Sequence, residues 1–147
     1  MLSEMEAPQD LIDLCTCTRV RTAARLISRT YDNALRPAGL KASQLAVLAA
    51  VASGEVVSIA ALSKALSMDR TTLSRNLQPL VGEKLVTLTE DGGGRSKTAR
   101  ITKNGEARLQ MAIPLWHKAQ QTLAKQAGTD LLSELNAKLT RLIRTYN

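Results

Sequence analysis

The chain has 147 residues, of which 44% are hydrophobic and only 2% aromatic, and its formal net charge is +7. This composition excludes a disordered chain and predicts one domain, or one domain with a helical extension, whose core consists of aliphatic side chains. The positive charge favours a polyanionic partner, because each Lys or Arg that neutralises a phosphate releases counterions. The acidic start does not resemble a signal peptide and no apolar run reaches transmembrane length, so we expect a cytoplasmic protein without a membrane partner.

The first part of the sequence predicts two helices. Apolar residues recur at helical spacing from Val20 to Leu35, which predicts a helix over residues 11–35 with one buried stripe. Arg19, Arg21, Arg25 and Arg29 lie on its other face, and Pro37 and Gly39 end it. A second helix over residues 43–52 is nearly all apolar on one side and is expected in the core.

Two short helices joined by a three-residue turn come next. Ser58 can cap a helix over residues 59–66 and Asp69 can cap a helix over residues 70–82, since each side chain offers an oxygen to a free backbone N–H. This arrangement is typical of a helix-turn-helix, although Ser67 stands where the turn usually has a glycine.

After Lys84 the apolar pattern changes to strict alternation. The stretches LVTLTE and SKTARIT predict a β-hairpin around the turn DGGG, and a hairpin at this place makes the motif a winged helix. Arg95 and Lys97 lie beside the three glycines, and an arginine at such a narrow tip can enter the minor groove of DNA.

The C-terminal part predicts two further helices, over residues 104–127 with a kink at Pro114 and over residues 130–146. Trp116 is expected in the core and His117 at the surface. The last helix has the alternating three- and four-residue spacing of a pairing seam, formed by Leu132, Leu135, Leu139, Leu142 and Tyr146. This seam covers barely two heptads, so it must pack against other helices.

The helix over residues 70–82 carries a polar face that needs an explanation. Leu73, Leu77 and Leu80 share one side and are expected to dock the helix on the domain. No acidic residue lies between Asp69 and Glu83, whereas an ordinary amphipathic helix would more often expose Glu, Lys and Ala. Arg, Asn and Gln can pair with base edges, and hydroxyls can reach phosphates or bases. We therefore predict a DNA interface formed by Arg70, Thr71, Thr72, Ser74, Arg75, Asn76, Gln78, Arg95 and Lys97.

Three stretches resemble the MarR family of transcriptional regulators: LRPAGLKASQLAVLAAV, IAALSKALSMDRTTLSRNLQPLVGEKLVTL and GRSKTARITKNG. The resemblance implies a mainly α (α+β) fold, with a winged helix-turn-helix over residues 37–103 and dimerisation helices over residues 1–36 and 104–147. It also implies a homodimeric repressor on a palindromic operator in double-stranded DNA, with recognition helices in successive major grooves and wings in the flanking minor grooves.

Individual positions carry the resemblance further. Thr71, Thr72 and Arg75 fall where such regulators commonly contact DNA, and Arg95 matches the family's wing arginine. Gly93 departs from the pattern, because many members have an aspartate there that pairs with wing arginines. We therefore expect a looser wing.

The resemblance leaves two kinds of signal open, of which the first is oxidation of a thiol. Cys17 stands at the same spacing from Tyr31 as the reactive cysteine of the family's organic-hydroperoxide sensors, and Tyr31 matches one tyrosine that holds the thiolate. Arg21 replaces the second tyrosine and could itself lower a thiol pKa. Cys15 and Cys17 would point about 200° apart on one helix, so a disulfide would form between subunits or with a small thiol. Alternatively, both cysteines are small buried hydrophobes at an interface.

The second kind of signal is a small aromatic or phenolic acid bound between the dimerisation and winged-helix regions. Arg21 and Arg25 could neutralise its carboxylate, or they could be solvated or contact the DNA backbone. We expect no cofactor, no metal and no enzyme activity, because one histidine and two cysteines form neither a metal ligand set nor a nucleophile–base pair. The alternative function is a basic nucleic-acid-binding scaffold without operator specificity, whose affinity would depend steeply on salt but little on sequence.

Overall fold

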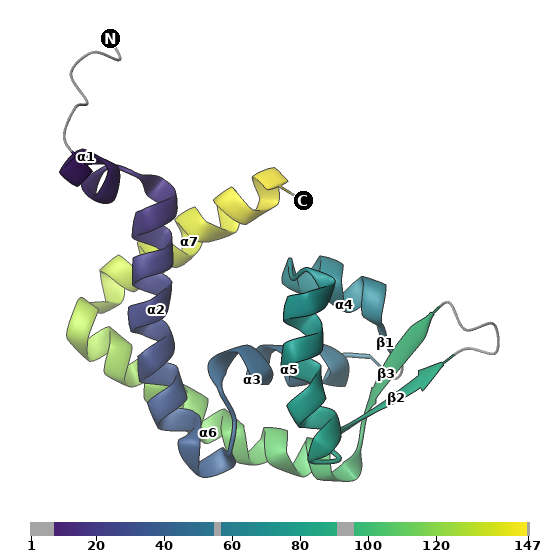
Figure 1. Ribbon diagram of the computed structural model, residues 1–147. Coiled ribbons are helices and arrows are strands. Elements are labelled where there is room, and N and C mark those ends of the chain that lie inside the picture. Colours follow the sequence, from purple (N-terminus) through teal and green to yellow (C-terminus); the bar gives the residue numbers. More distant parts are fainter. Residues whose placement is uncertain (1–7, 55–56, 91–95, 147) are drawn as a thin grey trace. The chain divides into compact units, whose positions relative to one another are not determined.

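The computed structural model describes residues 8–54, 57–90 and 96–146, in two compact units: unit 1 is residues 1–33 and 119–147, and unit 2 is residues 34–118. The predicted fold class is confirmed, because most described residues are helical and one small antiparallel sheet completes a winged helix-turn-helix (Figure 1). In chain order the elements are α1 (Pro8–Asp13), α2 (Thr16–Leu35), the 3-10 helix η1 (Arg36–Ala38), α3 (Ala42–Ala52), β1 (Val57–Ser58), α4 (Ile59–Leu66), α5 (Arg70–Gly82), β2 (Val86–Glu90), β3 (Lys97–Ile101), α6 (Lys103–Ala127) and α7 (Thr129–Tyr146).

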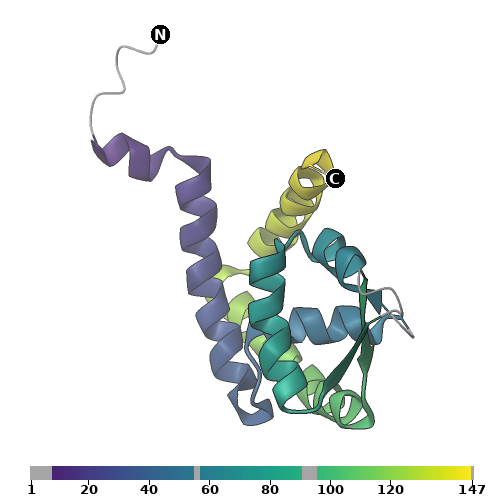
Figure 2. The same ribbon diagram turned by 45° about the vertical axis from the view of Figure 1, so that its right-hand side comes forward.

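The core of unit 2 is built around α3. Its residues Val47, Leu48 and Val51 are completely buried, as its apolar sequence predicts. Helix α5 crosses α3, and the β2–β3 hairpin follows directly after it (Figures 1 and 2). The docked side of α5 consists of Leu73, Leu77 and Leu80, which share one face of a helix at this spacing. The opposite side of α5 therefore remains free.

The helix-turn-helix has the predicted caps and bounds. Ser58 Oγ accepts a hydrogen bond from the Ala61 N–H at 3.1 Å, and Asp69 Oδ1 accepts one from the Thr72 N–H at 2.7 Å. Helix α4 ends at Leu66, and the C-cap residue Ser67 has a φ of 49°, in the left-handed region. Its N–H still donates to the Lys64 carbonyl at 3.2 Å. A serine therefore adopts the conformation for which this turn usually has a glycine.

Replacing Ser67 with glycine is expected to stabilise the protein. The left-handed region costs a side chain about 1–2 kcal/mol, and the greater freedom of an unfolded glycine offsets about 0.5–1 kcal/mol of this. The free energy of unfolding should therefore rise by roughly 0.5–1 kcal/mol in urea denaturation. Ser53→Gly is the matched control, because Ser53 has a φ of −74° and donates to the Ala50 carbonyl. That variant should lose stability, and a Ser67→Gly protein that does the same would contradict the prediction.

The sheet has the order β1-β3-β2 and is antiparallel throughout. Strands β2 and β3 pair from Val86↔Ile101 to Glu90↔Lys97, which matches the predicted hairpin. Strand β1 pairs Val57 with Ala99 and was not expected, because two residues show no readable alternation. The turn DGGG, with Gly93, and the adjacent Arg95 lie outside the described residues.

The start of α6 is held tightly to unit 2. The Thr102 hydroxyl accepts a hydrogen bond from the Gly105 N–H at 3.0 Å and donates to the Lys84 carbonyl at 2.7 Å. Arg108 Nη1 donates to the Ala38 carbonyl at 3.0 Å and to Glu83 Oε2 at 2.8 Å. Thr102, in the segment ITKNG, and Arg108 thus fasten the start of α6 to η1 and to the connection between α5 and β2. Helix α6 then continues through Pro114 to Ala127.

Unit 1 differs from the sequence-based expectation in two respects. The helix predicted over residues 11–35 is divided, because the Leu14 N–H closes α1 on Asp10 while the Cys15 carbonyl accepts the first hydrogen bond of α2. The predicted stripe is buried only in its second half: Leu35 is buried and Ile27, Tyr31 and Ala34 are partly buried, whereas Val20, Ala23 and Ala24 are exposed.

Trp116 is likewise not a core residue, since it is 37% exposed. The ring contact described for it is an edge-to-face contact with the exposed His117 on the same helix, with ring centroids 4.8 Å apart.

Across the described ranges, no helix is both long and apolar enough to span a membrane.

Candidate nucleic-acid interface

The free side of α5 presents most of the residues predicted to contact DNA. Six of the seven predicted positions on this helix are exposed, because the leucines fix its rotation. They are Arg70, Thr71, Thr72, Ser74, Arg75 and Gln78. The side chain of Asn76 is partly buried, and its Nδ2 donates to the Thr72 carbonyl at 2.9 Å. Asn76 is therefore the least available member of the predicted set.

The start of α5 carries a fixed negative charge. Hydrogen bonds from the Thr72 N–H and then from the Thr72 hydroxyl lower the pKa of Asp69 below its usual 3.8. The positive charge of Arg75 acts in the same direction with a smaller effect. The lowered pKa means that the carboxylate stabilises α5 at neutral pH and that this stabilisation is lost as the pH falls through the folded-state pKa. The cap is thus ionised at neutral pH.

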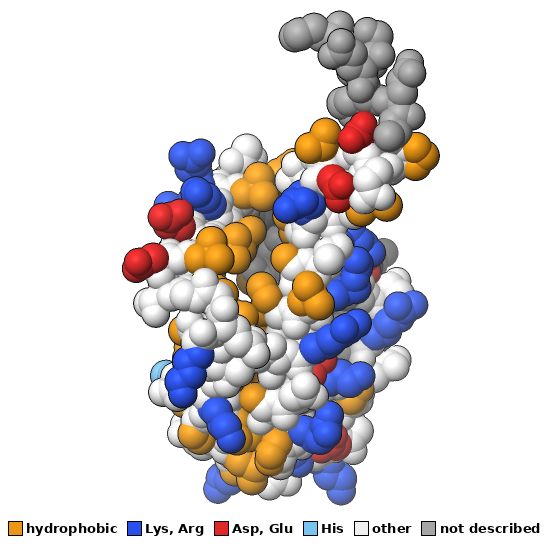
Figure 3. All heavy atoms as spheres, turned by 90° about the vertical axis from the view of Figure 1, so that its left-hand side faces the viewer, with side chains coloured by type: hydrophobic (Ala, Val, Ile, Leu, Met, Phe, Trp, Pro, Cys, Tyr) orange, Lys and Arg blue, Asp and Glu red, His pale blue; other side chains and the backbone are white. Residues whose placement is uncertain are grey.

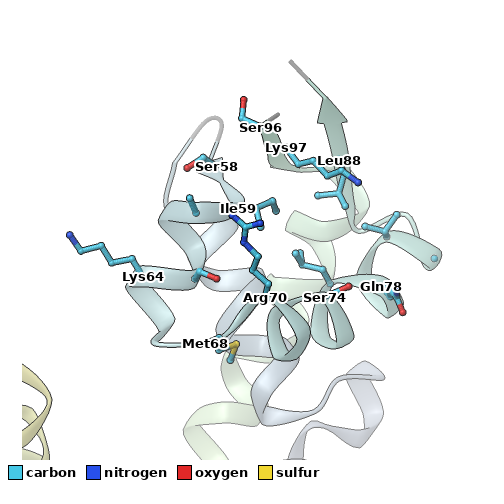
Figure 4. Close-up of a pocket in the computed structure, with 15 residues that line it drawn as sticks. Ser58, Ile59, Lys64, Met68, Arg70, Ser74, Gln78, Leu88, Ser96 and Lys97 are labelled. Carbon is cyan, nitrogen blue, oxygen red and sulfur yellow. The ribbon is translucent and has the colours of Figure 1, made fainter. Parts of the chain in front are cut away.

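The wing contributes a second group of predicted residues. Lys97 begins β3, is exposed and pairs with Glu90 Oε1 at 3.3 Å. Figure 4 shows Lys97 extending from the hairpin on the same side as Arg70, Ser74 and Gln78 of α5, and all four line one cavity. Thr71, Thr72 and Arg75 are not among its lining residues.

The structure also shows residues of this surface that the sequence did not reveal. Lys64 of α4 and Leu88 of β2 line the same cavity. Helical phase and strand alternation can predict that both side chains point outward, but they do not say which elements face each other. A contact between α4, α5 and a hairpin is a property of the tertiary structure.

The two cysteines of unit 1 occupy different local structures. Cys15 is partly buried and directly precedes α2, whereas Cys17 lies inside the helix and is exposed. The expectation that both cysteines lie on one helix is therefore wrong. Hydrogen bonds from the Thr18 hydroxyl and then from the Thr18 N–H lower the pKa of the Cys15 thiol. This environment favours Cys15 as the thiolate.

The remaining predicted residues of unit 1 also lie on α2. Tyr31 is partly buried, and burial raises the pKa of its phenol. It follows Cys17 by 14 positions on one helix, which corresponds to about 21 Å along the axis, so the two side chains cannot meet within one chain. Arg21 and Arg25 are exposed one turn apart, and Arg25 Nη2 donates to Thr22 Oγ1 at 3.0 Å. Within the ranges that the structure covers, no cluster of three His, Cys, Asp or Glu residues could hold a metal ion.

Comparison with known proteins places this surface in context. Residues 38–96 match the sequence model described as MarR family, while no curated protein matches significantly. The transcriptional regulator MosR of M. tuberculosis, solved in complex with DNA, is 31% identical, with 90% of this chain and 98% of that chain covered and a TM-score of 0.75.

Two more distant structures share the fold. A MarR mutant from E. coli complexed with operator DNA is 22% identical, with coverages of 90% and 96% and a TM-score of 0.77. The transcriptional repressor CouR, bound to a 23-mer DNA duplex, is 19% identical, with coverages of 94% and 99% and a TM-score of 0.78.

Proposed function

Since this chain belongs to the MarR family of DNA-binding transcriptional regulators, we propose that it is a homodimeric repressor that binds a palindromic operator and leaves it in response to a signal. The main support is the free side of α5, which is polar, basic and without acids between Asp69 and Glu83. The MosR complex supports the same reading, since a protein 31% identical to this chain was solved with DNA.

In the proposed complex, each copy inserts α5 into a major groove and its wing into the adjacent minor groove. Arg75, Thr71 and Thr72 are our candidates for base and phosphate contacts on α5, and Arg95 is our candidate in the wing. The residues in the flanking segments 1–36 and 104–147 would hold the two copies together. Operator half-sites would then lie about one helical turn apart.

Electrophoretic shifts with the DNA upstream of the protein's own gene test this function. We expect a complex that survives an excess of random competitor DNA, because base contacts favour the operator over other sequences. The alternative, a basic scaffold without operator specificity, predicts that random DNA competes equally well and that affinity falls steeply with salt. Equal competition would refute the repressor proposal.

The homodimer is supported by hydrophobic side chains that the single chain leaves exposed (Figure 3). Helix α7 has no buried residue among those described, although its leucines have the spacing of a pairing seam. Exposed apolar surface of this extent is typical of a protein–protein interface. In unit 1 it comprises Leu11, Ile12, Leu14, Val20, Leu26, Leu131, Leu142, Ile143 and Tyr146.

Leu142→Asp is expected to weaken the dimer by at least about tenfold in its dissociation constant, because each copy would place a charge in an apolar contact. Sedimentation equilibrium measures this change. Leu142 is 44% exposed in the single chain, so the variant should still fold. Ala137→Asp serves as the control, since Ala137 is exposed on the same helix outside the predicted seam. Equal dissociation constants for both variants would exclude this seam from the interface.

For the signal, we propose oxidation of a thiolate by an organic hydroperoxide, with Cys15 as the better candidate. The sequence favoured Cys17, but the hydrogen bonds from Thr18 lower the pKa of Cys15. An aromatic acid neutralised by Arg21 and Arg25 stays the alternative signal. DNA-bound protein treated with a hydroperoxide distinguishes them: Cys15→Ser should stay bound while the unsubstituted protein is released.

Thr18→Val is expected to raise the pKa of Cys15, because it removes the hydroxyl that lowers this pKa most. In a Cys17→Ser background, the rate of iodoacetamide alkylation reports on Cys15 alone. The pH at which this rate is half-maximal should move upward, since the thiolate is the reacting form. Thr22→Val, one turn further along α2, should leave the profile unchanged. A profile that is the same with and without the Thr18 hydroxyl would contradict the assignment.

A further inference from the structure

Helix α2 carries a basic face that the proposed DNA contacts of α5 and the wing do not use. Arg21, Arg25 and Arg29 are all exposed and stand four residues apart. At this spacing the three side chains share one face of the helix, and each lies about 6 Å further along the axis than the one before. Figure 3 shows a run of Lys and Arg side chains on the side of the molecule that α2 forms in Figure 1. We call these three arginines the basic strip, which is about 12 Å long.

The helix itself does not neutralise the basic strip. No acidic residue lies between Asp13 and Asp32, and the ion pairs that the structure describes all involve other basic residues. Arg25 Nη2 donates to the uncharged Thr22 hydroxyl at 3.0 Å. Like charges four residues apart destabilise a helix, and a merely solvated helix usually alternates acids with bases for this reason. The strip therefore has the character of a surface that meets an external anion.

The length of the strip favours an anion that repeats. A single carboxylate or phosphate ion would neutralise only part of it and leave the remaining arginines unpaired. In duplex DNA the phosphates of one strand recur every 3.4 Å along the axis, so about 12 Å spans several of them. A guanidinium can hold a phosphate with two parallel hydrogen bonds. The exposed hydroxyls of Thr22 and Ser28 lie beside the strip, and hydroxyls are common phosphate contacts as well.

From these observations we infer that the basic strip holds the phosphate backbone of duplex DNA of any sequence, outside the half-site that α5 reads. An acidic polypeptide also repeats its charge, but the arginines and hydroxyls together match phosphate, and the family of this chain binds DNA. Phosphate contacts carry no sequence information, so the strip should strengthen binding to operator and random DNA by the same factor. Its effect on the operator rests on the proposed function, whereas its contact with random DNA does not.

The first experiment measures binding to a random duplex over a range of salt concentrations, by fluorescence anisotropy. The probe is the full chain with Arg21, Arg25 and Arg29 all replaced by glutamine. The slope of log affinity against log salt should become shallower by about 0.9 for each arginine that a bound copy loses, or about 2.7 for the three. Affinity at 0.1 M salt should fall at least about tenfold. Arg25→Gln alone should account for about one third of the change in slope.

The matched control removes the same charge elsewhere. Lys125, Arg141 and Arg144 are exposed on α6 and α7, and replacing all three with glutamine leaves the strip intact. This variant should keep the slope of the unsubstituted protein. Equal changes in slope for both triple variants would overturn the proposal, because only net charge would then matter. Glutamine is as good a helix former as arginine, so urea denaturation should show no loss of stability in the strip variant.

The second experiment locates the contact and tests the class of partner. Backbone amide shifts are recorded while the random duplex, or polyglutamate of similar charge, is added to the full chain. We expect saturable shifts over residues 21–29 with the duplex, and these should persist when Arg70 and Arg75 of α5 are replaced by alanine. Shifts confined to α5 and the wing would overturn the proposal. It would also be overturned if polyglutamate shifted residues 21–29 and the duplex did not, since the strip would then serve an acidic protein.

The third experiment compares operator and random DNA at one salt concentration. The strip variant should bind both more weakly by the same factor, so that the preference for the operator is unchanged. A reduced preference would overturn a contact to the backbone alone. If the unsubstituted protein shows no preference for any operator, the proposed function fails, and the salt dependence with random DNA still decides the role of the strip.

Discussion

Gly105→Ala is expected to lower the free energy of unfolding of the protein by about 2–4 kcal/mol. An alanine Cβ at this position would lie 2.1 Å from the Leu85 carbonyl oxygen and 2.7 Å from Ile101 Cγ1. The carbonyl cannot move away easily, because it also accepts the Thr102 N–H at 3.0 Å. The start of α6 would have to shift instead, and with it the contacts that fasten α6 to unit 2.

Gly82→Ala is the matched control for this prediction. A Cβ at Gly82 meets nothing within 4 Å, and the residue ends α5 in an ordinary helical conformation. The substitution should therefore be neutral or stabilise the protein by about 0.4–1 kcal/mol, because it reduces the freedom of the unfolded chain. Urea denaturation of both variants measures the difference. If the two alanines have the same effect, α6 does not approach the Leu85 carbonyl as closely as the structure indicates.

Gly105 also illustrates what a sequence can reveal. The segment ITKNG marks the position through its resemblance to the MarR family, but not the reason for it. The reason is the approach of α6 to the Leu85 carbonyl, twenty residues earlier in the chain. By contrast, the starts of α4 and α5 could be predicted to the residue, because Ser58 and Asp69 cap their own helices. A hydrogen bond between neighbouring residues can be predicted from the sequence, whereas a close contact between residues far apart in the chain cannot.

The same distinction applies to the candidate site. The exposed side of α5 follows from the phase of Leu73, Leu77 and Leu80, which a sequence shows directly. The cavity between α4, α5 and the hairpin cannot be predicted in this way, because its lining residues, such as Ser63 and Leu88, belong to different elements. The division between α1 and α2 at Cys15 was also missed, because apolar residues continue through it at nearly helical spacing. This division places Cys15 directly before α2, where its thiol accepts the hydrogen bonds from Thr18 that lower its pKa.

Arg75→Ala is expected to reduce operator affinity by roughly 30-fold to 20,000-fold while it changes affinity for random DNA far less. A bidentate contact to a base contributes about 1–3 kcal/mol, and a homodimer would lose it twice. The substitution should not damage the helix, because the Asp69 cap depends mainly on the Thr72 N–H and only weakly on Arg75. Fluorescence anisotropy with operator and random duplexes at one salt concentration measures both affinities. Arg141→Ala, on the exposed surface of α7, controls for the loss of one positive charge.

Arg75→Lys then separates base readout from phosphate contact at the same position. Lysine keeps the positive charge but cannot present two parallel donors to a guanine edge. If Arg75 reads a base, lysine should restore the salt dependence of binding but not the preference for the operator. If Arg75 contacts a phosphate, lysine should restore both, and alanine should weaken operator and random DNA alike. The second pattern would exclude Arg75 from base readout and leave the other exposed polar residues of α5 as candidates to distinguish one operator from another: Arg70, Thr71, Thr72, Ser74 and Gln78.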